Sequence, residues 1–340
     1  MAVQDFSKLY YRTANCLTSD IIADFVPVSR VLGVDTSTGM GVVFTAMGTR
    51  FDLQYVAKEA FMATDNYEAD TRSIDDTPVT EVMRYVRGEV ISDGILPEKY
   101  NAFVEMVTKG DCVYKNFKEY STGEKASNIL FLISPAEEPK QAAEYFKSLC
   151  EKINKTVYCT NSYKDLGYLL LQMNKYAAAK EMYGAIEKDI EKYEYIVTDD
   201  SYVLDAFLIQ YPELADKIYF IDEFFVKNDM KFDIKEKVVI HESGVIERLY
   251  PNRKASYKDI LSEADIILPK RSGYDVTDSG IAGGLGLAEI NNLQVIASRR
   301  MYDLMSEEHD TIVTPCASEA LGLRCAESEN VVTLLEYVCR

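Results

Sequence analysis

From residue 126 onward, short apolar runs rich in β-branched residues alternate with amphipathic stretches. The run at 128–134 (NILFLIS) has the length of a buried strand, and residues 139–153 carry apolar side chains at helical spacing. Further strands are predicted at 156–158, 193–198, 217–221, 236–242, 265–270 and 310–315, and further helices at 175–193, 199–211, 255–264, 293–309 and 316–326. Because a crossover helix forces parallel pairing, this alternation predicts an α/β fold with largely parallel sheets.

The same pattern occurs twice. The segment EYIVTDDSYVLDAF (194–207) matches DTIVTPCASEALGL (310–323), and IYFIDEFF (218–225) matches VVTLLEYV (331–338). We interpret this as an internal duplication of about 100 residues per copy.

The first 125 residues differ, because helical stretches at 81–91 and 98–108 predominate there without alternation. A polar, turn-rich stretch at 121–127 marks the boundary. The predicted domains are therefore 1–125, 126–230 and 231–340.

Composition narrows the possible functions. The 340 residues include 37 Lys+Arg and 55 Asp+Glu, which gives a net charge of −18 and argues against nucleic acid as a partner. No apolar run reaches the ~20 residues of a membrane span, and the N-terminus lacks the pattern of a signal peptide, so we expect a cytoplasmic protein. The seven cysteines are scattered without a C-x2-C pair, and two histidines exclude a histidine-rich metal site.

Two stretches near the N-terminus have the spacing of a bacterial cubane-cluster motif, C-x2-C-x2-C-x3-C-P, but together keep only one of its eight cysteines. The four ligand positions of the first stretch, followed by Pro27, hold Cys16, Ser19, Ile22 and Val26. Those of the second, followed by Pro78, hold Tyr67, Asp70, Ser73 and Thr77.

A second set of degenerate motifs follows the predicted strands. In the first copy, the positions of a Gly-Cys, a CCG and a T-x-C-x-x-C motif hold Ser134, Cys159, Asp200 and Val203. In the second copy, HESGVIER keeps His241 and Arg248 but has Gly244 at the cysteine. DSGIAGG has Asp278 and Ser279 at the two cysteines and keeps Gly280, Gly283 and Gly284, and TPCASE keeps Cys316 and has Glu319 at the second cysteine.

This order of motifs resembles the heterodisulfide reductase catalytic subunit and the iron–sulfur subunits of glycerol-3-phosphate and glycolate dehydrogenases. The resemblance implies a mainly helical, ferredoxin-derived N-terminal domain followed by two CCG-type α/β repeats around a pseudo-twofold axis. It also implies anaerobic metabolism such as methanogenesis, and a protein partner in a redox complex. Since most cluster cysteines are missing, we expect no cofactor, and we expect bulky side chains to fill the former cavities: Ile22, Val26, Tyr67, Tyr158 and Val203.

Three functional hypotheses follow from this resemblance. The first is a redox-silent paralogue that serves as a subunit, scaffold or regulator. The second is an iron–sulfur oxidoreductase with a non-standard or partner-completed cluster. The third is a small-anion site formed by the Gly-rich loop, His241 and Arg248. A homo-oligomer is compatible with each of them.

Individual residues keep two interpretations. Cys16, Cys159 and Cys316 are either residual ligands or inert, half-buried thiols. Asp200, Asp278 and Glu319 are either a carboxylate cluster for a hard cation such as Mg²⁺ or solvated loop acids. His241 is either a general base or a hydrogen-bonded residue at a strand end.

Overall fold

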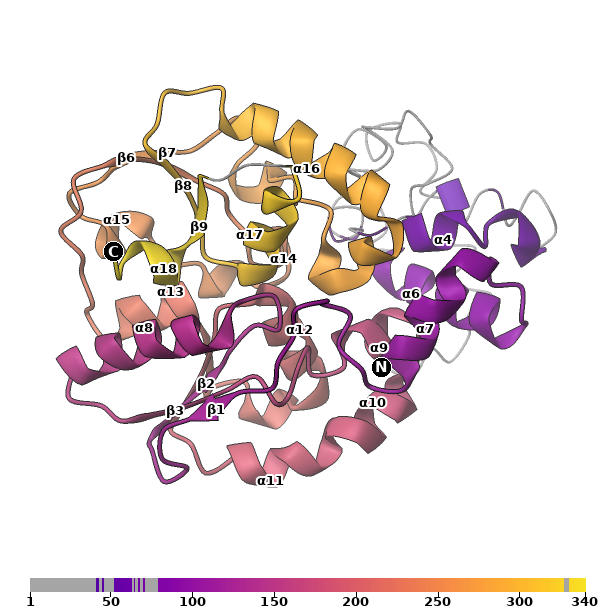
Figure 1. Ribbon diagram of the computed structural model, residues 1–340, viewed down its shortest axis with the longest axis horizontal. Helices are drawn as coiled ribbons and strands as arrows, with labels where there is room; N and C mark the ends of the chain where they lie inside the picture. The colour runs from indigo at the N-terminus through magenta and orange to yellow at the C-terminus, as the bar shows by residue number, and fades with distance from the viewer. Residues whose placement is uncertain are drawn as a thin grey trace.

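The computed structural model describes residues 41, 42, 45, 52–62, 64, 67, 70, 79–326 and 330–340. Two β-sheets form its framework (Figure 1). The first has the order β1-β3-β2-β4-β5, with strands at Ser121–Thr122, Val157–Thr160, Ile129–Leu132, Tyr195–Thr198 and Ile218–Phe220. Only β1 runs antiparallel to its neighbour, and the other four strands are parallel.

The second sheet repeats this arrangement. Its order is β7-β6-β8-β9, with strands at Asp265–Ile267, Lys237–Ile240, Thr311–Thr314 and Val331–Thr333, and all are parallel. In both sheets the first parallel strand along the chain lies between the second and the third, and the fourth lies at the edge. We refer to residues 126–230 as the first unit and to 231–340 as the second unit.

Helices separate and cover the two sheets (Figure 1). The layer between the sheets contains α8 (Pro139–Lys152), α13 (Ile221–Lys227), α15 (Tyr257–Ile260) and α18 (Leu334–Tyr337). The outer face of the first sheet is covered by α9 (Tyr168–Gln172), α10 (Tyr176–Tyr183), α11 (Glu187–Ile190) and α12 (Ser201–Gln210). The outer face of the second sheet packs against α16 (Ile290–Leu304) and α17 (Ala317–Arg324).

Strand alternation distributes the core over these layers. In β2, Ile129 and Phe131 face the layer between the sheets, whereas Leu130 and Leu132 face the outer helices. The Phe131 ring stacks on Phe146 of α8 with 4.2 Å between centroids. This continuous apolar run is typical of a parallel strand that is buried on both faces.

The helices of the N-terminal region pack on the first unit. They are α4 (Glu59–Met62), α6 (Val79–Ser92) and α7 (Asn101–Thr108), which confirms the helices predicted at 81–91 and 98–108. Arg87 of α6 is fully buried, and its guanidinium donates to the carbonyls of Ala60 and Gln172 at 2.8 and 3.2 Å. These bonds connect α6 to α4 and α9. No helix within the described residues is long and apolar enough to span a membrane.

The predicted strands from 128 to 315 are confirmed, but several helices differ from the sequence analysis. The helix predicted at 175–193 is interrupted at Gly184, where a 3-10 turn separates α10 from α11, in agreement with the low helix propensity of glycine. The helix predicted at 255–264 ends at Ile260, because the Ile260 carbonyl accepts a hydrogen bond from the Phe232 amide at 2.9 Å.

The helix predicted at 293–309 instead spans Ile290–Leu304. The acidic residues Glu307 and Glu308 lie just beyond its end. Negative charges there oppose the helix dipole and would destabilise a continuation. The sequence analysis did not predict α4, α9, α13, α14 (Gly244–Leu249) or α18.

Asp222 at the start of α13 provides a test of this packing through pH. The side chain is buried, and burial together with Glu223 and Glu247 raises its pKa from 3.8 to about 7. A raised pKa stabilises the fold only while the carboxyl is protonated, so this contribution is lost as pH rises from about 4 through 7. The Asp222→Asn protein should therefore gain more stability over wild type at pH 8 than at pH 5, by ~2 kcal/mol.

Urea unfolding at both pH values measures this difference. Asp216→Asn, at an exposed position, is the matched control and should leave the pH dependence unchanged. An equal effect of Asp222→Asn at both pH values would show that the carboxyl is not held in its protonated form.

Candidate functional site

The carboxyl ends of the two parallel sheets meet in a buried polar junction. The amide of Ala317, after β8, donates to the carbonyl of Asp199, after β4, at 2.8 Å. Around this contact lie fully buried polar residues of both units: Ser134, Asp200, Ser201, His241, Ser279, Ser318 and Glu319. In open α/β sheets this edge is where functional residues gather, so the junction is the candidate site.

Asp200 is the N-cap of α12 and the centre of the first part of the junction. Its Oδ1 accepts a hydrogen bond from the Tyr202 amide at 3.0 Å. Its Oδ2 accepts from Ser134 Oγ at 2.6 Å and from Ser318 Oγ at 2.5 Å. Burial raises the pKa of this carboxyl, whereas the Ser134 and Ser318 hydroxyls lower it. The carboxylate thus receives donors from both units.

Cys316 is the N-cap of α17 and corresponds to Asp200 in the repeated sequence. The two caps face each other, since the Cys316 thiol lies 3.9 Å from Asp200 Oδ1 and 3.3 Å from Ser201 Oγ. Burial, with the charges of Asp200 and Glu319, raises the thiol pKa well above its usual value. The raised pKa disfavours the thiolate, so the free thiol is a weak nucleophile.

Glu319 is the centre of the second part of the junction. It accepts hydrogen bonds from Tyr202 Oη at 2.6 Å, the Ser279 amide at 2.7 Å and His241 Nε2 at 3.0 Å. Burial raises the pKa of this carboxyl, and the bonds from Tyr202 and Ser279 lower it. Because all three partners can donate, they satisfy an ionised carboxylate.

His241 links Glu319 to a buried arginine. Arg300 Nε lies 3.2 Å from His241 Nδ1, and a guanidinium can only donate, so Nδ1 accepts and Nε2 carries the proton. Burial and the Arg300 charge lower the pKa of His241 to about 3. The imidazole is neutral and already bonded at both nitrogens, which favours the interpretation of a satisfied strand-end histidine over a general base.

Arg248 and Asp278 form a second buried pair beside His241. Arg248 Nη1 lies 3.5 Å from Asp278 Oδ2, and its other nitrogens donate to the carbonyls of Tyr274 and Val276. Asp278 Oδ1 accepts from the Gly244 amide at 2.8 Å. Burial and Glu319 raise the pKa of Asp278 to about 6, while Arg248 opposes this rise.

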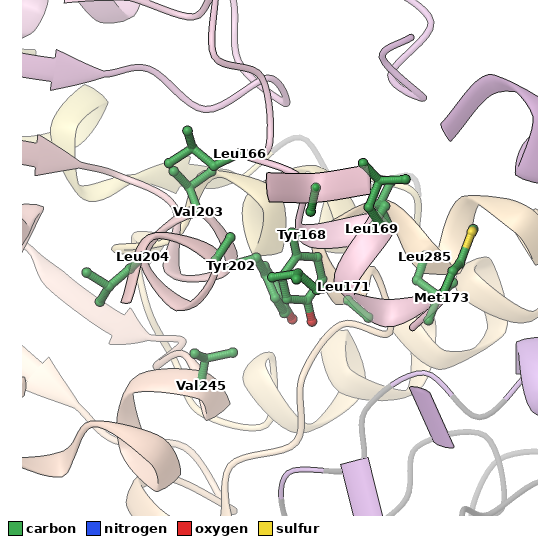
Figure 2. Packing of buried hydrophobic residues seen from close by; sticks show 14 of the residues in the cluster. Leu166, Tyr168, Leu169, Leu171, Met173, Tyr202, Val203, Leu204, Val245 and Leu285 are labelled. Carbon is green, nitrogen blue, oxygen red and sulfur yellow. The ribbon is translucent and has the colours of Figure 1, made fainter. Parts of the chain in front are cut away.

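The Gly-rich loop at 278–286 approaches the first unit closely. Gly283 and Gly284 adopt φ values of 60° and 103°, and a Cβ at Gly283 would lie 2.6 Å from the Tyr168 ring. Tyr168 and Tyr202 lie together, with ring centroids 5.2 Å apart (Figure 2). The loop therefore uses its glycines to contact side chains of the first unit.

Cys159 does not join the junction. Its side chain lies in the apolar core between the sheets, because strand alternation turns it to the opposite face from Tyr158. Burial raises the pKa of this thiol. Cys16, Ile22 and Val26 lie outside the described residues.

Two of the residues expected to fill former cavities are buried. Tyr67 Oη lies 2.5 Å from Tyr168 Oη, and Val203 packs in the same apolar cluster (Figure 2). Tyr158 is only half-buried. Asp70 accepts from the Thr80 amide at 2.7 Å, and burial raises its pKa to about 7.

Sequence reasoning missed Ser318, Tyr202 and Arg300. Arg300 could have been found, because it occupies a position on the buried face of a helix that also buries Ala297, Met301 and Leu304. A charged residue at such a position indicates a buried partner. Tyr202 and Ser318 carry no such signal, since their partners are more than 110 residues away.

An iron–sulfur cluster does not fit the residues of this junction. A cubane needs four thiolates. The described junction offers one thiol, Cys316, and the nearby Asp200 is hydrogen-bonded to Ser134 and Ser318. Within the described part of the chain, no group of three or more His, Cys, Asp or Glu side chains is arranged to hold a metal ion.

The structure defines the class of the chain as an α/β protein with two sheets that meet at their carboxyl edges. No protein-family model, curated protein or solved structure matches it.

Substitution of Glu319 tests whether the junction stabilises the fold. Glu319→Gln removes the charge that three donors share and places an amide N–H group against them. We expect a loss of ~3 kcal/mol in unfolding free energy, because breaking a buried charged network leaves groups uncompensated. Urea unfolding monitored by circular dichroism measures it, and Glu307→Gln at an exposed position is the control. A loss below ~1 kcal/mol would contradict the network.

Proposed function

We propose that this chain is a redox-silent relative of the heterodisulfide-reductase-type iron–sulfur proteins. In this proposal a degenerate ferredoxin-like domain (1–125) precedes two degenerate CCG repeats (126–230 and 231–340). The shared strand order of the two sheets supports the duplication, as does the position of Asp200 and Cys316 before equivalent helices. The chain then acts as a subunit, scaffold or regulator in a redox or metallocofactor complex.

One observation carries this proposal: side chains at the expected ligand positions bond to one another. Ser134, Asp200 and Glu319 stand where the motif has cysteines, and each is buried and hydrogen-bonded within the junction. A buried carboxylate with protein donors is stable without a metal, whereas a cluster would require these bonds to break. This arrangement supports a structural junction between the units rather than a redox centre.

The junction also bears on the two alternatives. An iron–sulfur oxidoreductase would need thiolate ligands, but burial raises the pKa of Cys316 well above its usual value and Cys159 faces the apolar core. An anion site would need free donors, but Arg248 and His241 donate to Asp278, Glu319 and backbone carbonyls. A role through the molecular surface remains the best-supported function.

Metal analysis tests the proposal directly. We expect iron and acid-labile sulfide near zero per chain after strictly anaerobic purification. The purified chain should also lack the absorbance that iron–sulfur clusters show above about 320 nm. Several irons per chain with matching sulfide would overturn the proposal and favour the oxidoreductase.

A matched substitution separates a structural thiol from a ligand. Cys316→Ser keeps a small hydrogen-bonding side chain at the N-cap of α17, where serine is favoured. We expect unfolding free energy to change by less than ~1 kcal/mol, and iron content to stay at the wild-type level. A loss of bound iron in this variant alone would identify Cys316 as a ligand.

A further inference from the structure

The outward face of α16 exposes no carboxylate. Its exposed residues are Ile290, Asn291, Gln294, Val295, Ser298, Arg299 and Tyr302, and none of them is acidic. By contrast α7, α8 and α10 each expose a glutamate: Glu105, Glu144 and Glu181. In a chain with 55 acidic residues and a net charge of −18, α16 exposes seven residues without a carboxylate, whereas α13 exposes only Val226 and Lys227.

Large apolar side chains project from this face. Tyr302 is 69% exposed, Val295 46% and Ile290 45%, and Met305 just after the helix is 62% exposed. Leu268 and Tyr274 are also exposed. The segment between them lies beside α16, because Arg300 of that helix donates to the carbonyls of Lys270 and Arg271. Exposed apolar surface of this kind marks interaction sites.

The equivalent layer of the first unit is covered. There α9, between the second and third parallel strands, packs against α6 and α7 of the N-terminal region. In the second unit α16 has the equivalent position in the chain, after β7 and before β8 (Figure 1). Among the described residues, the exposed side chains of α16 have no comparable cover.

We propose that this face binds the same face of a second copy of the chain, with the two α16 helices antiparallel about a twofold axis near Ser298. In that arrangement Ile290 of one copy opposes Met305 of the other, and Val295 opposes Tyr302. The small Ser298 side chain at the centre lets the two backbones approach. The two helices also align with opposed dipoles.

Charge favours a second copy as the occupant. Two chains of −18 repel each other wherever carboxylates meet, so association requires a face that carries none. The α16 face exposes no carboxylate, and its single exposed cation, Arg299, pairs with the buried Asp303 at 3.4 Å and lies 5.1 Å from the Tyr302 ring centroid. A basic partner protein would instead select one of the acidic faces.

The size of the face sets the strength of the dimer. Ile290 to Met305 span about 22 Å at 1.5 Å per residue. Only Tyr302 of the four large side chains is aromatic, so these side chains supply only part of the ~800 Å² per partner that a standard interface buries. We therefore expect a weak dimer.

This proposal does not depend on the missing clusters, so its test is separate from the iron analysis. Sedimentation velocity of the full chain from about 1 to 200 μM should show a monomer–dimer equilibrium. Val295→Glu should raise the dissociation constant at least tenfold. Val226→Glu on α13, where valine is 41% exposed, is the matched control and should leave it unchanged. A wild-type chain that stays monomeric throughout, or equal behaviour of the two variants, would overturn the proposal.

Cross-linking checks the axis independently. Ser298→Cys places a thiol beside its twin, so mild oxidation should give a disulfide-linked dimer on a non-reducing gel. Asn101→Cys, at an exposed position on α7, should give only the wild-type background. If sedimentation shows a dimer but Ser298→Cys does not cross-link above that background, the antiparallel arrangement is wrong.

Discussion

The arrangement of this chain depends on two buried carboxylates that are satisfied across the boundary between the units. Asp200 of the first unit accepts from Ser318 of the second, and Glu319 of the second accepts from Tyr202 of the first. Removing these donors while both carboxylates stay buried would cost several kcal/mol. The reciprocal bonds therefore hold the carboxyl edges of the sheets together.

Compensation of charge explains the rest of the junction. Asp200 lies at the N-terminus of α12, where the helix dipole favours a negative charge. Glu319 and Asp278 lie near Arg300 and Arg248, and the neutral His241 joins Glu319 to Arg300 without adding a charge. Gly244 leaves room for this pairing, because a Cβ there would overlap the Asp278 carboxylate.

The sequence predicted the parallel strands from 128 to 315, because each is a short apolar run bounded by turns, a signal that is local. It did not predict β1, which lies in the polar stretch interpreted as a domain boundary. The candidate site was predicted only in part. Asp200 and Glu319 were found through the repeated motif, but their partners Tyr202 and Ser318 are distant in sequence. Cys159 was associated with the site, whereas the pleat of β3 turns it into the apolar core, and the sequence alone does not say which face of a fully buried strand meets a site.

The two units share a strand order but not a surface, and this asymmetry follows from the position of the N-terminal helices. These helices cover α9 and supply apolar residues such as Val86 and Val90 to the core of the first unit. The N-terminal helices also reach the second unit, where Tyr100 Oη donates to Glu289 at 2.5 Å at the start of α16. The second unit buries the inner side of α16 through Leu293, Ile296 and Met301 but leaves Val295 and Tyr302 exposed. Cover on one unit alone is therefore enough to account for the exposed apolar side chains of α16 on the other.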